Sequence, residues 1–205
     1  MFFFLDAPAT LMLLLVIVLV SGYALTVRAD LVQKLALQPR RVVADGEYYR
    51  MASAWLIHGG IGHLAINLFT LFAFGPAVEA LLGTAAFLAV FFGAELAASG
   101  LTVLLKKESP SYASVGASGA ISGILFSYSL YRPTDLIYLF AALPIPAWLF
   151  AVGFVAASIY AMKRAEGGGG IAHEAHLGGA LGGIIVTILL DPGVVMTFLR
   201  QMGLG

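Results

Sequence analysis

Two glycine-rich apolar segments of this chain carry side chains that can do chemistry together. Ser118 lies in the segment GASGAISG (116–123), and His176 lies in the segment AHLGGALGG (175–183). A serine hydroxyl becomes a nucleophile when an imidazole within about 2.6–3.2 Å accepts its proton. If the two segments pack against each other, they predict an acyl-transfer site with Ser118 as the nucleophile and His176 as the base.

The glycines of both segments favour such packing. His176, Gly179 and Gly183 follow the spacing i, i+3, i+7 and share one face of a helix. Glycines on a helix face let another helix come close in a membrane. Taken alone, each segment has a simpler interpretation: a helix-packing motif with an incidental histidine, and a serine such as Ser118 that bonds to a backbone carbonyl.

Glu174 is the acidic residue nearest to His176 in the sequence. Successive helix residues point about 100° apart, so we do not expect the Glu174 carboxylate to reach the imidazole. The pattern therefore favours a serine–histidine dyad over a triad. The sequence HEAH (173–176) is one residue short of the zinc-protease spacing, and we expect neither a metal nor another cofactor.

A third segment, HGGIGHLAIN (58–67), carries further polar side chains. His63 and Asn67 stand at i, i+4 and should point the same way. Both can donate hydrogen bonds, and each donor aimed at the oxyanion formed when serine attacks a carbonyl contributes about 3–4 kcal/mol. We therefore predict His63 and Asn67 as oxyanion and substrate-positioning residues. The alternative is a polar contact between helices.

The composition indicates a membrane protein. Of the 205 residues, 60% are apolar and 11% are charged, whereas about a quarter of a soluble domain is charged. Most of the surface must therefore face lipid. The net charge is zero and there are no cysteines, which argues against a nucleic-acid partner, disulfides and a cysteine nucleophile.

Six apolar stretches are long enough to cross about 30 Å of hydrocarbon as helices. They cover residues 9–27, 52–76, 82–105, 113–131, 136–162 and 171–190. Lipid tolerates only helices or closed barrels, and these runs lack the two-residue alternation of strands. No Lys or Arg precedes the first stretch, so we interpret it as a retained span rather than a cleaved signal. Residues 1–205 are thus expected to form a single all-α membrane domain.

The three polar segments belong to the second, fourth and sixth stretches, which run in the same direction. Their chemistry-bearing residues should lie within about 10–20 Å of one membrane face, where water has access.

Together, these segments resemble the rhomboid intramembrane serine proteases, over about residues 48–190. The resemblance rests on the runs at 49–58 and 62–68, GPAVE (75–79), GASG (116–119) as the Gly-x-Ser-Gly nucleophile motif, PIPA (144–147), and AHLGG (175–179). It implies a rhomboid-like bundle of six transmembrane helices with a Ser118/His176 dyad. It also implies an oxyanion hole formed by His63, Asn67 and the Ser118 backbone amide.

The implied activity is hydrolysis of a peptide bond in single-pass transmembrane substrates, with a preference for small residues at the cleaved bond. The sequence departs from the family at Ser122, where members often carry an aromatic residue packed on the histidine. The first loop is also short.

Two rival interpretations remain. One is a rhomboid-like protein that binds membrane helices for quality control without cutting them, although such members lose the serine or the histidine. The other is a small transporter, which the clustering of polar residues at one face and the lack of an internal repeat disfavour.

The resemblance and the charge pattern disagree about orientation. All but two of the 11 Lys and Arg residues, Arg132 and Arg200, lie in the first, third and fifth loops. The positive-inside rule places those loops, and the site, in the cytoplasm. Prokaryotic members of the family usually open the site to the outside. We follow the family and expect a multi-pass protein of a bacterial plasma membrane.

Overall fold

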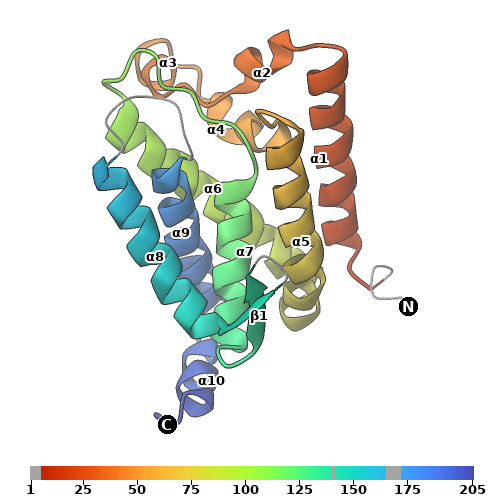
Figure 1. Cartoon of the computed structure of the whole chain (residues 1–205), viewed down its shortest axis with the longest axis vertical. Helices are drawn as coiled ribbons and strands as arrows, with labels where there is room; N and C mark the ends of the chain where they lie inside the picture. Colours follow the sequence, from red (N-terminus) through yellow and green to blue (C-terminus); the bar gives the residue numbers. More distant parts are fainter. Residues whose placement is uncertain (1–5, 140–141, 165–171) are drawn as a thin grey trace.

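The computed structural model describes residues 6–139, 142–164 and 172–205 (Figure 1). The helices are α1 (Pro8–Thr26), α2 (Asp30–Leu35), α3 (Pro39–Ala44), α4 (Arg50–Ser53), the 3₁₀ helix η1 (Ala54–Leu56), α5 (Ile61–Leu82), α6 (Thr84–Lys106), α7 (Ser118–Tyr131), α8 (Ala147–Arg164), α9 (His173–Leu190) and α10 (Val194–Gln201). Two antiparallel strands, β1 (Leu136–Leu139) and β2 (Leu143–Pro146), form a hairpin between α7 and α8. The long helices lie side by side as a bundle, with α7 in the middle (Figure 1).

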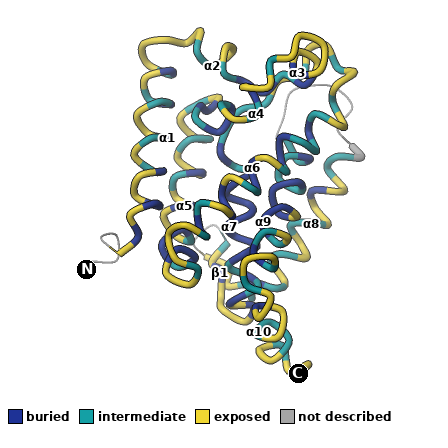
Figure 2. The backbone as a smooth tube through the Cα atoms, turned by 180° about the vertical axis from the view of Figure 1, so that it is seen from behind, coloured by how far each residue is buried: buried dark blue, intermediate teal, exposed yellow. Residues whose placement is uncertain are grey.

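Four helices are long and apolar enough to cross a membrane, namely α1, α5, α6 and α9. Large apolar side chains cover their outer faces, for example Leu19 on α1, Phe69 on α5 and Leu189 on α9, each at least 65% exposed. Exposed positions follow the outside of the bundle and buried ones its interior (Figure 2). Such a surface would be unstable in water and suits lipid, so the chain is a multi-pass membrane protein. Helices α7 and α8 remain predicted spans.

The centre of the bundle is packed through small residues. Eleven of the 14 residues of α7 are buried. A Cβ atom added to Gly179 of α9 would lie 1.9 Å from the Gly119 carbonyl oxygen, and one added to Gly183 would lie 2.3 Å from the Gly123 Cα atom. The two backbones therefore touch directly, as the glycine faces of the two segments predict.

The stretch expected to be one helix over 136–162 is not a helix over its first part. Residues 136–139 and 143–146 form the paired strands β1 and β2, with Ile137 opposite Ile145, and α8 begins at Ala147. Pro144 and Pro146 explain the difference, because proline lacks an N–H donor and clashes within a helix but is tolerated at the edge of a sheet.

Two other helices begin later than expected. The stretch over 52–76 is interrupted after η1, and α5 starts at Ile61 after Gly59 and Gly60. The stretch over 113–131 starts as a helix only at Ser118. The glycine run at 167–170, expected to be a hinge or cap, lies outside the described residues.

Glu79, near the end of α5, fixes the start of α1. Its carboxylate is buried and accepts hydrogen bonds from the backbone N–H groups of Ala9 and Thr10 at 2.9 and 2.8 Å. The hydroxyls of Thr10 and Thr84 donate to the same carboxylate at 2.8 and 2.9 Å. The first N–H groups of a helix have no partner within it, and a carboxylate also suits the positive end of the helix dipole. This one side chain therefore joins α1, α5 and α6.

The polar segment between α1 and α5 folds around a buried arginine. The Arg50 guanidinium is 2% exposed. It donates to the carbonyls of Lys34 and Ala36 at 2.8 Å and pairs with Glu47. Arg50 is thus a structural residue of this segment, which caps one end of the bundle above α6 (Figure 1).

Candidate active site

Ser118 and His176 meet where α7 and α9 begin. Ser118 is the first residue of α7, and His176 lies in the first turn of α9. The Ser118 Oγ atom is 2.8 Å from the His176 Nε2 atom. This distance is within the range for proton transfer from a serine to an imidazole. The structure therefore brings together the two residues that the sequence predicts as nucleophile and base.

A constrained loop sets the start of α7. Gly116 has φ +111°, a conformation that side-chain-bearing residues rarely adopt. Its N–H donates to the Ala54 carbonyl at 2.9 Å, and Ser114 exchanges backbone hydrogen bonds with Leu37. The loop is thereby held against the segment before α5. The Ser118 N–H then lies at a helix N-terminus, where backbone donors have no partner within the helix.

His63 lies over this loop. A Cβ atom on Gly116 would be 2.6 Å from the His63 Cε1 atom and 2.8 Å from its Nε2 atom. The imidazole therefore occupies the space that the missing side chain leaves, two residues before the nucleophile. Asn67 is buried, and its amide donates to the His63 carbonyl at 2.9 Å. The same amide carries a second N–H donor.

His58 supports the loop from the other side. It is fully buried, and its Nδ1 atom is 2.8 Å from the Ser21 hydroxyl of α1. Its Nε2 atom accepts a long hydrogen bond of 3.5 Å from the Ala117 N–H, and its ring meets that of His63 edge to face. This histidine therefore links α1 to the nucleophile loop. The sequence indicated that His58 and His63 cluster, but gave no sign of this link.

Glu174 bonds to Tyr112, and not to His176. The Tyr112 hydroxyl donates to the Glu174 carboxylate, and Tyr112 lies in the loop between α6 and α7. Burial raises the pKa of Tyr112, and the hydrogen bond to Glu174 raises it further. This bond ties the loop before α7 to the first turn of α9, so it braces the two helix starts that carry the dyad.

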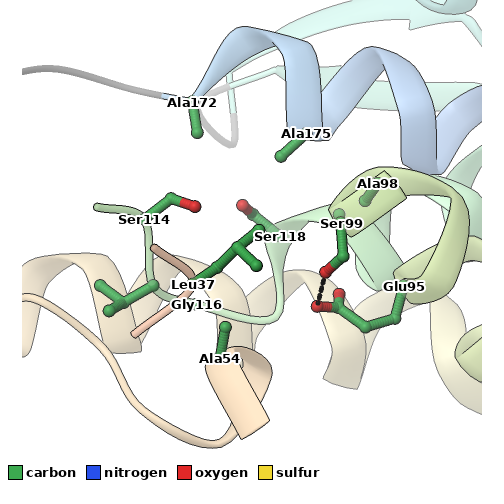
Figure 3. A pocket seen from close by; sticks show the side chains of 12 residues that line it. Leu37, Ala54, Glu95, Ala98, Ser99, Ser114, Gly116, Ser118, Ala172 and Ala175 are labelled. Carbon is green, nitrogen blue, oxygen red and sulfur yellow. Dashed lines mark hydrogen bonds between the residues drawn. The ribbon is translucent and has the colours of Figure 1, made fainter. Parts of the chain in front are cut away.

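A small cavity of about 20 Å³ lies beside Ser118. Such a volume holds about one water molecule. Figure 3 shows Ser114 and Ser118 on one side of it and, from α6, Glu95 joined to Ser99. The Ser99 hydroxyl is 3.3 Å from the Glu95 carboxylate, which is 6% exposed.

Sequence reasoning missed Glu95. A signal was available, because an ionisable residue within an apolar span is costly and usually functional. It also missed Phe154 of α8, whose ring lies next to the imidazole of His176. An apolar residue in an apolar helix carries no such signal.

Within the described residues, no three His, Cys, Asp or Glu side chains cluster in a way that could hold a metal ion.

The fold and the site together define a multi-pass membrane protein with a serine–histidine pair near one end of its bundle. The family model of the Rhomboid domain matches residues 45–192. The chain therefore belongs to the rhomboid family, as its motifs predict.

Three relatives illustrate the match. The chain is 41% identical over 86 residues to the putative rhomboid protease YdcA of Bacillus subtilis, covering 42% of each chain. It is 39% identical over 84 residues to the rhomboid protease GluP of the same organism, covering 41% of this chain and 16% of GluP. It is 32% identical over 131 residues to the human mitochondrial presenilin-associated rhomboid-like protein, covering 62% of this chain and 34% of that protein. The matches thus span less than half the length of each relative.

Proposed function

We propose that this protein is an intramembrane serine protease, a hydrolase that cuts single-pass transmembrane proteins at or near the membrane surface. The observation that carries the proposal is the 2.8 Å contact between the Ser118 Oγ and His176 Nε2 atoms. The chain also belongs to the rhomboid family, and two of its relatives are named as rhomboid proteases, which supports the proposal.

In the proposed reaction, His176 accepts the Ser118 proton as Oγ attacks the carbonyl carbon of the substrate. The resulting oxyanion receives hydrogen bonds from the Ser118 N–H, His63 and Asn67. Cleavage of the C–N bond releases the amine, to which His176 gives the proton, and leaves an ester on Ser118. Water then attacks the ester, and His176 takes a proton from that water. The bond between the acyl carbon and the Ser118 Oγ atom breaks, His176 returns the proton to Oγ, and the carboxylic acid is released.

The proposal includes six membrane spans. Helix α7 has 14 residues and is surrounded by the other long helices. Because most of its sides face protein and not lipid, a helix of this length can serve as one of the spans. Helix α8 has 18 residues, with an apolar stretch from Ala147 to Met162. We further propose a bacterial plasma membrane, with the site open to the outside. Of the basic residues that favour the opposite orientation, Arg50 is used inside the protein, where it binds backbone carbonyls.

The test is cleavage of a single-span reporter by purified protein in detergent. Wild type should cut, whereas Ser118→Ala and His176→Ala should each lose more than about 10³-fold of the rate. Ser129→Ala is the matched control, since Ser129 is a buried serine of the same helix whose hydroxyl bonds to the Leu125 carbonyl. Folded wild type that binds the reporter without cutting it would instead support the non-proteolytic alternative.

A further inference from the structure

We propose that Phe154 of α8 is a positioning residue for His176, in place of the aromatic residue that this chain lacks at position 122. This inference rests on the proposed function, because it assigns Phe154 a part in keeping the base aligned with Ser118. The ring centroids of Phe154 and His176 are 5.8 Å apart, and the two planes are inclined by 33°. This is the spacing of offset aromatic pairs.

Ser122 itself does not reach the imidazole as an aromatic ring would. Its hydroxyl donates to the Ser118 carbonyl at 2.7 Å, one turn back along α7. The side chain at this position therefore reinforces the helix that carries the nucleophile. Support for the base must come from another element.

Few other contacts orient the imidazole in the described part of the chain. Nε2 contacts Ser118, and the His173 ring meets the His176 ring nearly edge-on at 6.1 Å. Glu174, the nearest acid in sequence, bonds to Tyr112. The face of Phe154 therefore limits rotation of an imidazole that no carboxylate of the described residues holds.

Phe154 contacts two other aromatic rings. Phe126 of α7 meets it at 5.6 Å and 64°, and Phe150 lies one turn earlier on α8 at 5.9 Å and 33°. Phe126 is buried. The ring of Phe154 thus lies between Phe126 of α7 and the histidine of α9, and the contact with the buried Phe126 is independent of Phe150.

In the proposed reaction, the contact between Phe154 and His176 acts on the charge of the base as well as on its packing. His176 becomes positively charged each time it accepts the Ser118 proton, and an aromatic face attracts a nearby cation. A ring that keeps Nε2 directed at Ser118 and favours the charged imidazole raises the rate of the chemical step. We do not expect the Phe154 ring to change the affinity for a transmembrane substrate.

The experiment compares Phe154→Leu with Phe150→Leu in full-length protein. Both changes remove one phenyl ring from α8, but only the first removes the ring beside His176. Three measurements are made on each variant: kcat and KM on the reporter, the rate at which a small fluorophosphonate labels Ser118, and the thermal unfolding midpoint. Phe154→Tyr, which keeps the ring, is the conservative variant.

We expect Phe154→Leu to lower both kcat and the labelling rate about three- to tenfold, with KM within about twofold of wild type. Phe154→Tyr should retain wild-type labelling, and Phe150→Leu should stay within about twofold of it, because Phe126 still contacts Phe154. If Phe154→Leu lowers the midpoint, Phe154→Met supplies a second variant of similar volume. As a readout independent of activity, the nuclear magnetic resonance signal of the His176 ring should move in Phe154→Leu and stay in place in Phe150→Leu.

Two results would overturn the inference alone: labelling of Phe154→Leu at the wild-type rate, or an equal loss in Phe154→Leu and Phe150→Leu. A folded wild type that neither cuts the reporter nor reacts with the probe would instead overturn the proposed function, and the inference with it.

Discussion

The two sides of His176 are built differently. On one side, α9 meets α7 backbone to backbone, with no room for a Cβ atom at Gly179 or Gly183. On the other, α8 reaches the imidazole through the ring of Phe154, and only Ala147 and Ser158 are buried among its residues whose side chains are described. From this difference we infer that the two contacts have different roles. The glycine contact sets the distance between base and nucleophile, and α8 orients the base.

The largest effect should follow from disturbing the close-packed side. In Gly179→Ala, the new methyl group would lie 1.9 Å from the Gly119 carbonyl oxygen, so α9 must move away from α7. We expect loss of cleavage and a fall of about 3 kcal/mol in the free energy of unfolding, at the upper end for overpacked cores.

Gly153→Ala on α8 is the matched control, because no atom other than its chain neighbours and the nearby backbone of its own helix lies within 4 Å of the added Cβ atom. It should leave cleavage unchanged and unfolding unchanged or slightly less favourable. If the two substitutions reduced cleavage and the free energy of unfolding equally, the two sides of His176 would not differ in how closely they are packed.

The second prediction concerns Glu79, which joins α1, α5 and α6 away from the dyad. Glu79→Ala removes the acceptor of three hydrogen bonds from the start of α1 and of one from Thr84 of α6. Because buried donors are left without a partner, we expect the free energy of unfolding to fall by about 2–4 kcal/mol. The activity per folded molecule should stay near wild type.

Reversible unfolding in mixed micelles measures this change. Thr84→Ala, which removes one of the four donors, should cost about 1 kcal/mol. A Glu79→Ala variant as stable as Thr84→Ala would show that the carboxylate does not hold α1 in place.

The third prediction uses the bond between Tyr112 and Glu174. Tyr112→Phe should lower cleavage about two- to fivefold, since a neutral-to-charged hydrogen bond between the two helix starts is lost. The rate of reporter cleavage, normalised to folded protein, measures it.

The same bond predicts a pH dependence of stability. Burial and the hydrogen bond raise the pKa of Tyr112, so the folded state holds this proton more tightly than the unfolded state. The stabilisation of the folded state that comes from the Tyr112 proton is therefore complete below about pH 10, the ordinary pKa of tyrosine. It is lost as the pH rises further, through the raised pKa of the folded state. Between pH 9 and 11.5, stability should fall more steeply for wild type than for Tyr112→Phe. Parallel curves would argue against the bond.

The smallest effect is expected at position 122. Ser122→Ala removes a hydroxyl that bonds within its own helix, and a loss of this kind is worth a fraction of a kcal/mol. The labelling rate of Ser118 should remain within about twofold of wild type, well above that of Phe154→Leu. A larger loss of labelling in Ser122→Ala than in Phe154→Leu would show that Ser122, and not Phe154, supports His176.

The sequence predicted the parts of the site that depend on local spacing. The glycine faces of two segments predicted that α7 and α9 would touch, and hence that Ser118 and His176 would meet. Long apolar runs predicted the membrane helices, because the requirement to pair every backbone group in lipid leaves few alternatives. The family followed from motifs in order.

Features that depend on tertiary contacts escaped prediction. The strands β1 and β2 are as apolar as a membrane helix, and only Pro144 and Pro146 distinguish this stretch in the sequence. Phe154 is one apolar residue among many in α8, and its place beside His176 depends on how three helices pack. Arg50 counted as a surface charge in the sequence, whereas the fold buries it among backbone carbonyls.

The most direct test of the central claim is covalent labelling of the nucleophile. Purified protein in detergent is treated with a fluorophosphonate, and the modified peptide is identified by mass spectrometry. We predict one adduct, on Ser118, in wild type, no adduct in Ser118→Ala, and labelling slowed more than about 10³-fold in His176→Ala. Labelling of folded His176→Ala at the wild-type rate, or an adduct that persists in Ser118→Ala, would contradict the dyad.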